Sequence, residues 1–275
     1  MMRVSVYRAL GWLLLALTTL FVCVPIAFVV VTSFNEKGIY FLRTGYSFSL
    51  HWYESLPKGF FSSFKVSIIV AVASALLALP PGIAAAFVIV RGHFPGKALL
   101  ANLFLSPLIL PLIVLGVSYY RYFIIIESST GAPLLDSYTG LILAHAGFTW
   151  AYVIRAVVAG LQHFDRRLEE AAEDLGASPF YTMLHVTLPS IRPAIAAGMI
   201  FAFMISFDDV PVSLFLYGTD TTPLPIELMN YMSDSIDPYI TAMSSITVLF
   251  SVVLMFVVER TVGLRRVIGL PTRHT

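Results

Sequence analysis

Long stretches without a charged residue are the feature that most restricts what this chain can fold into. The first stretch runs from about residue 9 to residue 31 and contains no Lys, Arg, Asp or Glu. An α-helix rises 1.5 Å per residue, so about 20 apolar residues cross the hydrocarbon core of a bilayer. We predict an all-α integral membrane protein, a single membrane domain over residues 1–275, with six transmembrane helices at about residues 9–31, 66–90, 98–117, 139–160, 191–216 and 239–258.

Composition agrees with a membrane protein and excludes several other classes. Charged residues make up 12% of the chain, against about 25% in soluble domains. The single cysteine, Cys23, excludes a disulfide framework or a cysteine metal cluster. Gly96-Lys97 lacks the glycine pattern of a phosphate-binding loop. We expect no catalytic residues, no metal and no cofactor in this chain. We also expect the first stretch to be a retained span, because it exceeds the apolar region of a typical signal peptide.

The distribution of Lys and Arg predicts the orientation. If the N-terminus is cytoplasmic, twelve of the 17 basic residues lie on the cytoplasmic side and five on the other side. Cytoplasmic loops of membrane proteins carry the excess of Lys and Arg. Both termini and residues 161–190 are therefore expected in the cytoplasm.

A strongly charged segment, residues 165–189, interrupts this apolar chain. Seven of its first ten residues are charged, while one predicted helical face carries Leu168, Ala171, Ala172 and Leu175. An amphipathic helix resting on the bilayer is one interpretation. However, the apolar face is narrow and rich in alanine, whereas membrane anchoring favours large side chains. The other face is acidic and would be repelled by anionic lipid; it carries Glu169, Glu170, Glu173 and Asp174. A groove in a partner protein suits the segment better.

Capping residues in this segment predict two short helices joined by a glycine corner. Asp165 suits the N-cap of the first helix, and Gly176 suits the left-handed position that ends it. Ser178 and Pro179 suit the N-cap and first position of the second helix. The Leu188-Pro189 pair is expected to stop that helix.

The same segment is similar to the EAA loop of bacterial ABC importer permeases. The family pattern is Glu-Ala-Ala, three residues, Gly, nine residues, an aliphatic residue, one residue and Leu-Pro. Its fixed positions are filled here by Glu170, Ala171, Ala172, Gly176, Val186, Leu188 and Pro189. The segment also lies between the fourth and fifth of six predicted spans, as in that family. The run from Ser206 to Val210, with Asp208 and Asp209, and the run from Pro223 to Ile226 resemble the spermidine/putrescine-type permeases.

This resemblance implies a type I ABC importer permease (MetI-like) fold, with residues 161–190 as a cytoplasmic coupling loop. It implies a second permease subunit in a heterodimer, two cytoplasmic ATPase subunits that bind ATP and Mg, and a periplasmic substrate-binding protein. Glu170 would be the charged contact to the ATPase, Ala171 and Ala172 would permit close approach, and Gly176 would form the corner. The expected location is the bacterial inner membrane, with lipid around the spans and no nucleic-acid partner.

Four residues are candidates for the translocation path. Asp208 and Asp209 are adjacent acids near one end of the predicted fifth span, and acids at such depth usually face a cavity or a partner group. The alternative is a structural pair that caps a helix or bonds to the partner permease. Trp150 and Tyr152 could contact an alkyl-ammonium group, although bundle packing is the alternative for both. A lone histidine such as His145 is more often packed and hydrogen-bonded than functional.

We therefore predict the permease subunit of an ATP-driven importer for polyamines such as spermidine and putrescine. Amino-acid-like compounds, opines or phosphonates are alternative substrates, because specificity resides largely in the binding protein. A stand-alone secondary transporter is the alternative function, but no inverted repeat stands out in the sequence. A membrane-embedded enzyme ranks last, because nothing resembles paired catalytic residues on facing spans.

Overall fold

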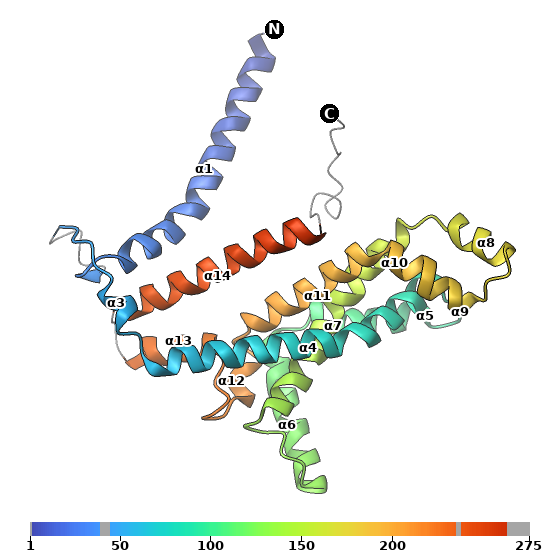
Figure 1. The fold of residues 1–275 in the computed structure, drawn as a ribbon. Coiled ribbons are helices and arrows are strands. Elements are labelled where there is room, and N and C mark those ends of the chain that lie inside the picture. Colours follow the sequence, from blue (N-terminus) through green and yellow to red (C-terminus); the bar gives the residue numbers. More distant parts are fainter. Residues whose placement is uncertain (1, 39–44, 235–237, 263–275) are drawn as a thin grey trace. The chain divides into compact units, whose positions relative to one another are not determined.

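The computed structural model describes residues 2–38, 45–234 and 238–262 as an almost entirely helical chain (Figure 1). Outside the helices, the described part contains one isolated antiparallel bridge, between Asn35 and Phe48. The chain divides into two compact units, which are described separately below. In chain order the elements are α1 (Met2–Ser33), α3 (His51–Glu54), α4 (Lys58–Arg91), α5 (Lys97–Leu105), the 3-10 helix η2 (Ser106–Leu108), α6 (Leu112–Thr130), α7 (Tyr138–Gln162), α8 (Arg167–Asp174), α9 (Pro179–Thr182), the π-helix η3 (Met183–Thr187), α10 (Leu188–Ser190), α11 (Arg192–Phe207), α12 (Ser213–Leu216), α13 (Leu224–Asp234) and α14 (Tyr239–Val262).

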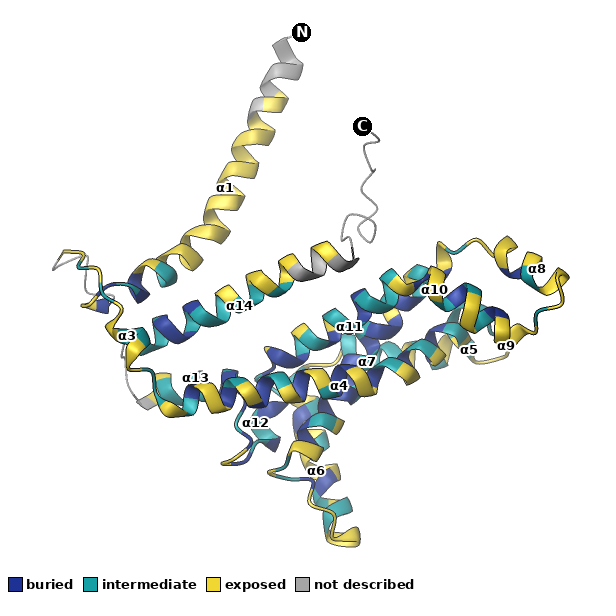
Figure 2. Cartoon of the chain, in the orientation of Figure 1, coloured by how far each residue is buried: buried dark blue, intermediate teal, exposed yellow. Residues whose placement is uncertain are grey.

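The first unit combines Met1–Phe60 with Leu228–Leu254, and its longest helix is α1. The most apolar 18-residue window of α1 contains no buried residue, and Figure 2 shows most of the helix exposed. Polar contacts hold the turn that follows α1. The Asn35 side-chain amide donates to the Gly38 carbonyl at 2.8 Å and accepts from the Ser47 N–H at 2.7 Å. Because Asn35 is fully buried, these bonds satisfy a side chain that would otherwise be costly to bury.

The second unit combines Phe61–Glu227 with Met255–Thr275 and contains α7 as its most buried long helix (Figure 2). Glycine lets α11 approach α7 closely. A Cβ built on Gly160 would lie 2.4 Å from the Ala194 Cβ, and one on Gly198 would lie 3.1 Å from the Val153 Cα. Small residues at helix contacts are typical of membrane proteins, because backbone approach increases van der Waals contact.

Helix α4 also packs on α7 through a glycine. A Cβ on Gly82 would lie 2.7 Å from the Val153 Cγ1. Helix α4 is continuous across Pro80 and Pro81. It begins at Lys58, eight residues before the predicted start at about residue 66. Its alanines join the α7 and α11 side chains in one apolar cluster, whose fully buried members include Ala86, Val153, Ile154, Val157 and Ala202.

The predicted single helix at 98–117 is wrong. Proline breaks it: α5 gives way to η2, and α6 starts only at Leu112, after Pro111 with ψ 126°. The 12 residues from Lys97 to Leu108 span about 18 Å, too little for a crossing. Helix α6 is long and apolar enough to cross, but Arg121 and Glu127 within it lower its hydropathy, so the predicted span ended at about residue 117.

The predicted helix at 191–216 is also wrong in extent. Helix α11 ends at Phe207, and the separate turn of α12 follows after Pro211. In the described residues, five helices are long and apolar enough to cross a membrane, or six if the bent pair Pro179–Ser190 and Arg192–Phe207 is one span. This agrees with the predicted all-helical, multi-span class of fold.

Candidate coupling and transport sites

The charged segment folds as two short helical pieces with a glycine corner between them, as predicted. The N-cap of α8 is Arg166 and not Asp165 as predicted. The Asp165 carboxylate instead accepts from the N–H of Arg167, the first residue of α8, at 3.0 Å. Gly176 has φ +90°, a left-handed conformation that costs other L-residues about 1–2 kcal/mol. The Ala177 N–H then bonds to the Ala172 carbonyl at 3.0 Å and closes the end of α8. This arrangement holds the corner in one conformation.

The second helical piece begins with the predicted cap. The Ser178 side chain accepts from the Tyr181 N–H at 3.3 Å, and Pro179 occupies the first turn of α9. The prediction that the Leu188-Pro189 pair stops this helix is wrong, because both residues lie in α10. The stretch before them is the wide π-helix η3. A proline has no N–H and crowds the carbonyl four residues earlier, and a wider turn accommodates both effects. The chain bends by 69° between Ser190 and α11.

The predicted docking face of α8 is open on the surface of the chain. Leu168 is 51% exposed and Leu175 is 90% exposed, although both are large apolar residues. Glu170 and Ala171 are exposed beside them, and Ala172 is half-buried. The second half of the motif is less accessible, because Leu188 packs against the apolar cluster of α4, α7 and α11 while Pro189 is exposed. The first half of the motif therefore presents an apolar and acidic surface that no part of the described chain covers.

Glu169 departs from its predicted position on the exposed acidic face. It is 7% exposed, and its Oε1 lies 2.6 Å from Nη2 of Arg91. The Thr187 hydroxyl donates to the same carboxylate oxygen. Helical periodicity could not predict this contact, because it describes one helix at a time, whereas Arg91 lies 78 residues earlier in the chain.

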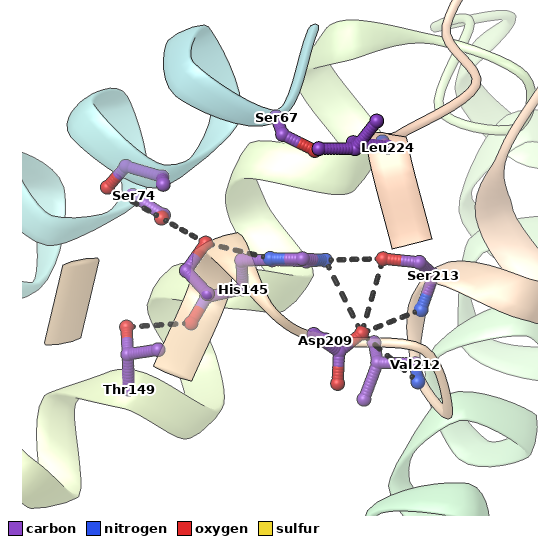
Figure 3. Close-up of polar contacts among 10 residues, drawn as sticks. Ser67, Ser74, His145, Thr149, Asp209, Val212, Ser213 and Leu224 are labelled. Carbon is purple, nitrogen blue, oxygen red and sulfur yellow. Dashed lines mark hydrogen bonds and ion pairs between the residues drawn. The ribbon is translucent and has the colours of Figure 1, made fainter. Parts of the chain in front are cut away.

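A buried polar cluster, defined as Ser74, His145, Ser206, Asp209 and Ser213, lies within the second unit (Figure 3). His145 hydrogen-bonds through Nδ1 with the Ser206 hydroxyl at 2.8 Å and through Nε2 with the Ser213 hydroxyl at 3.1 Å. Ser206 also bonds with Ser74 of α4 at 3.0 Å. The cluster thus links α4, α7 and α11 by hydrogen bonds, and His145 is packed and bonded, as expected of a lone histidine on an apolar helix.

The two adjacent aspartates point into different environments. Asp208 is exposed, whereas Asp209 is 3% exposed. The Asp209 Oδ2 accepts from the N–H groups of Val212 and Ser213 at 3.1 and 2.8 Å and from the Ser213 hydroxyl at 3.0 Å. These bonds lie at the start of α12, whose N-cap residue is Val212. Oδ1 of Asp209 has no hydrogen-bond partner among the described residues.

The aromatic candidates lie apart from the acids. The Trp150 ring packs edge-on against Phe104, with 5.3 Å between the ring centroids, and belongs to the apolar cluster of α4, α7 and α11. Tyr152 is half-buried two positions further along α7, so the two side chains leave the helix in different directions. Within this chain the structure therefore does not gather the four candidates into one site. The described residues also contain no group of three His, Cys, Asp or Glu side chains that could hold a metal ion.

Comparisons with known proteins agree with this architecture. Residues 78–262 match the family described as "Binding-protein-dependent transport system inner membrane component". The chain is 33% identical over 237 residues to the putrescine transport system permease protein PotI of Escherichia coli (strain K12), covering 85% of this chain and 83% of PotI. It is 32% identical over 237 residues to the spermidine/putrescine transport system permease protein PotC of Haemophilus influenzae (strain ATCC 51907 / DSM 11121 / KW20 / Rd), covering 84% of this chain and 88% of PotC.

Two solved structures share the fold at low identity. One is a bacterial ABC transporter involved in the import of the acidic polysaccharide alginate, with a TM-score of 0.74, 15% identity and coverage of 93% of this chain and 96% of that chain. The other is the MetNI methionine ABC transporter in an inward-facing conformation, with a TM-score of 0.56, 18% identity and coverage of 80% and 99%.

The fold is that of a multi-span helical membrane protein with an exposed charged segment between its long helices. The chain belongs to the family of binding-protein-dependent transport system inner membrane components, the permease subunits of ABC importers. It is therefore a multi-pass inner-membrane protein that works with other permease, ATPase and binding-protein subunits. The family and the MetI-like fold predicted from the charged segment are confirmed.

Proposed function

We propose that this permease subunit imports polyamines such as putrescine and spermidine, and that residues 161–190 are its coupling loop to a cytoplasmic ATPase subunit. The observation that carries the coupling role is the uncovered surface of α8, where Glu170 and Ala171 are exposed beside exposed Leu168 and Leu175. Large apolar side chains left open next to charged ones are typical of a protein contact.

The joint after α8 supports a mechanical role for this loop. A short helix can transmit force only if its ends are fixed. The left-handed Gly176 and the capped start of α9 at Ser178 fix one end, and the Asp165 contact fixes the other. Closure of an ATPase dimer would then move α8 as a rigid piece, with Glu170 as the charged contact and Ala171 and Ala172 permitting close approach.

The assembly we propose contains this chain, a second permease subunit in a heterodimer, two cytoplasmic ATPase subunits that bind ATP and Mg, and a periplasmic substrate-binding protein. Both termini of the chain lie in the cytoplasm in this arrangement. The excess of Lys and Arg on that side supports it.

Support for a polyamine substrate comes from the relatives, which are permeases for putrescine and spermidine by name. Among the path candidates, Asp208 is the one acid with an exposed side chain, so it is available to meet a cation or a partner subunit. We retain Asp209, Trp150 and Tyr152 as path candidates, with the two aromatic rings available to contact an alkyl-ammonium group. An amino-acid-like compound, an opine or a phosphonate is the alternative substrate.

The proposed function is tested with the chain, its partner permease, its ATPase and its binding protein reconstituted in vesicles. We expect ATP-dependent uptake of labelled putrescine or spermidine. Uptake of an anionic solute without either polyamine would contradict the substrate, and failure of the tagged chain to copurify the ATPase would contradict the coupling role.

A charge reversal at Glu170 tests the docking contact. We expect Glu170→Lys to reduce copurification of the ATPase and uptake by about tenfold, because it places a cation where an acid makes the contact. Asp220→Lys is the matched control, since Asp220 is an exposed acid outside the segment. Equal copurification by Glu170→Lys and the control would refute the role of Glu170.

A further inference from the structure

One carboxylate oxygen joins three separate segments of the second unit. Glu169 of α8 accepts from Arg91, the last residue of α4, and from Thr187, the last residue of η3. We refer to these three residues as the clamp. Thr187 is fully buried, and the side chains of Glu169 and Arg91 are 9% and 26% exposed. The clamp is therefore largely shielded from water. Ionic contacts in such a position are screened less than those at the surface.

The clamp holds a helix that has little other contact with the membrane part of the chain. Glu169 is the buried residue of α8. Its neighbours on the open side, including Leu168 and Glu170, are exposed. A force applied to the open side by a partner therefore enters the rest of the chain at the two ends of α8 and at Glu169.

Arg91 leads directly from the clamp to the apolar core. Its guanidinium lies over the Phe87 ring, 4.8 Å from the ring centroid, which restrains the side chain further. Helix α4 then runs without interruption to Gly82, where it contacts Val153 of α7. A displacement of α8 would thus reach the centre of the second unit through one continuous helix.

Thr187 provides a second connection from the same oxygen. It ends η3, and α10 and the bend into α11 follow. The clamp therefore ties α8 to two of the helices that pack on α7, namely α4 and α11. The polar contact fixes their relative positions more narrowly than apolar packing would, because hydrogen bonds depend on distance and angle.

We propose that Glu169 is a positioning residue that makes α8, α4 and the start of α11 move together, so that motion at the coupling loop opens or closes the membrane path. This inference rests on the proposed coupling function. In this role Glu169 acts through Arg91 and Thr187. The alternative is a contact that only stabilises the fold.

The central test compares Glu169→Gln with Asp220→Asn in the reconstituted complex. Asp220 is the control, an exposed acid outside the coupling loop. We expect Glu169→Gln to leave copurification of the ATPase and the basal rate of ATP hydrolysis unchanged, and to lower polyamine uptake per ATP by about tenfold. Unchanged uptake per ATP in Glu169→Gln would overturn the proposal, even if its thermal stability falls.

A charge exchange tests the pairing itself. Arg91→Glu alone is expected to lower uptake per ATP as Glu169→Gln does, and the double variant Arg91→Glu with Glu169→Arg is expected to restore most of it. If the single variants fail to fold, Arg91→Lys and Thr187→Val are milder changes. Arg91→Lys should retain most of the coupling because it keeps the charge, and Thr187→Val should lose part of it. A double variant no better than Arg91→Glu, or wild-type coupling in Thr187→Val, would overturn the proposal.

A distance measurement reports positioning directly. In a Cys23→Ser background, spin labels at Val88→Cys on α4 and Glu173→Cys on α8 should give a narrow distance distribution that stays narrow when ATP binds. Glu169→Gln should broaden it. The same distribution with and without Glu169→Gln would overturn the clamp. If the wild-type complex shows no ATP-dependent uptake at all, the proposed function fails instead, and the two failures are distinguishable.

Discussion

At the scale of single residues, Asp208 and Asp209 show how two identical neighbours take different positions. Adjacent helical residues point about 100° apart, and here the helix also ends between Phe207 and Asp208. Asp209 turns inward and accepts three hydrogen bonds at the start of α12, while Asp208 remains exposed. The sequence indicates that an acid pair is present but does not show which acid is buried.

Substitutions at Asp209 are expected to change stability, whereas substitutions at Asp208 are expected to change transport. Asp209→Ala should lower the free energy of unfolding by about 1–2 kcal/mol because α12 loses its side-chain acceptor. Asp209→Asn keeps a carbonyl oxygen in that place and should cost less. Asp208→Asn should leave stability unchanged and reduce polyamine uptake. Thermal unfolding in detergent and uptake in vesicles measure the two effects, and a larger loss of stability in Asp208→Asn than in Asp209→Ala would contradict the assignment.

At the scale of elements, the glycine corner joins two short helices without packing against anything. Gly176 has a left-handed φ, and a Cβ added to it would meet no atom within 4 Å. The position therefore needs glycine for conformation alone. Gly131 at the end of α6 is a close match, with φ +71° and equally open surroundings.

The two glycines give a paired experiment. Gly176→Ala and Gly131→Ala should each cost about 1 kcal/mol of conformational strain, but only Gly176→Ala should lower uptake per ATP, because only that corner sets the direction of α8. Gly176→Asn should recover part of the loss, since asparagine tolerates the left-handed region. Equal uptake per ATP in Gly176→Ala and Gly131→Ala would show that the corner does not carry force.

Short sequence patterns predicted the glycine corner between α8 and α9. They did not predict contacts between residues that are far apart in the sequence. The caps at Ser178 and Gly176 depend on a few neighbouring residues, so spacing alone identified them. Glu169 was misplaced because its partner Arg91 belongs to another helix. The break at Pro111 was misjudged for a different reason: prolines bend some membrane helices and end others, and α4 continues through two of them.

At the scale of the whole molecule, the proposed orientation in the membrane rests on the distribution of charge rather than on packing. The second compact unit contains both the coupling loop and the loop around Asp220. The predicted arrangement places the coupling loop in the cytoplasm and Asp220 on the opposite side, in agreement with the uneven distribution of basic residues.

Cysteine labelling in intact cells tests this orientation. Cys23 is the only cysteine in the sequence, so Cys23→Ser provides a background without thiols. A membrane-impermeant maleimide added outside should label Asp220→Cys readily, and it should label Glu173→Cys only after the membrane is opened. Labelling of Glu173→Cys in intact cells would reverse the proposed orientation.

The π-helix η3 has a consequence for comparing this chain with its relatives. A π turn is an α turn that has gained one residue, and here the gain lies between Gly176 and the Leu188-Pro189 pair. Without it, every later side chain would rotate by about 100°, and Thr187 would turn away from Glu169. The number of residues between Gly176 and Pro189 therefore indicates whether this helix contains the π turn. A relative with one residue fewer in this interval could form a regular α-helix only by losing the contact between the residue at position 187 and the residue at position 169. A one-residue gap in this interval of an alignment therefore marks a change of structure and not merely of length.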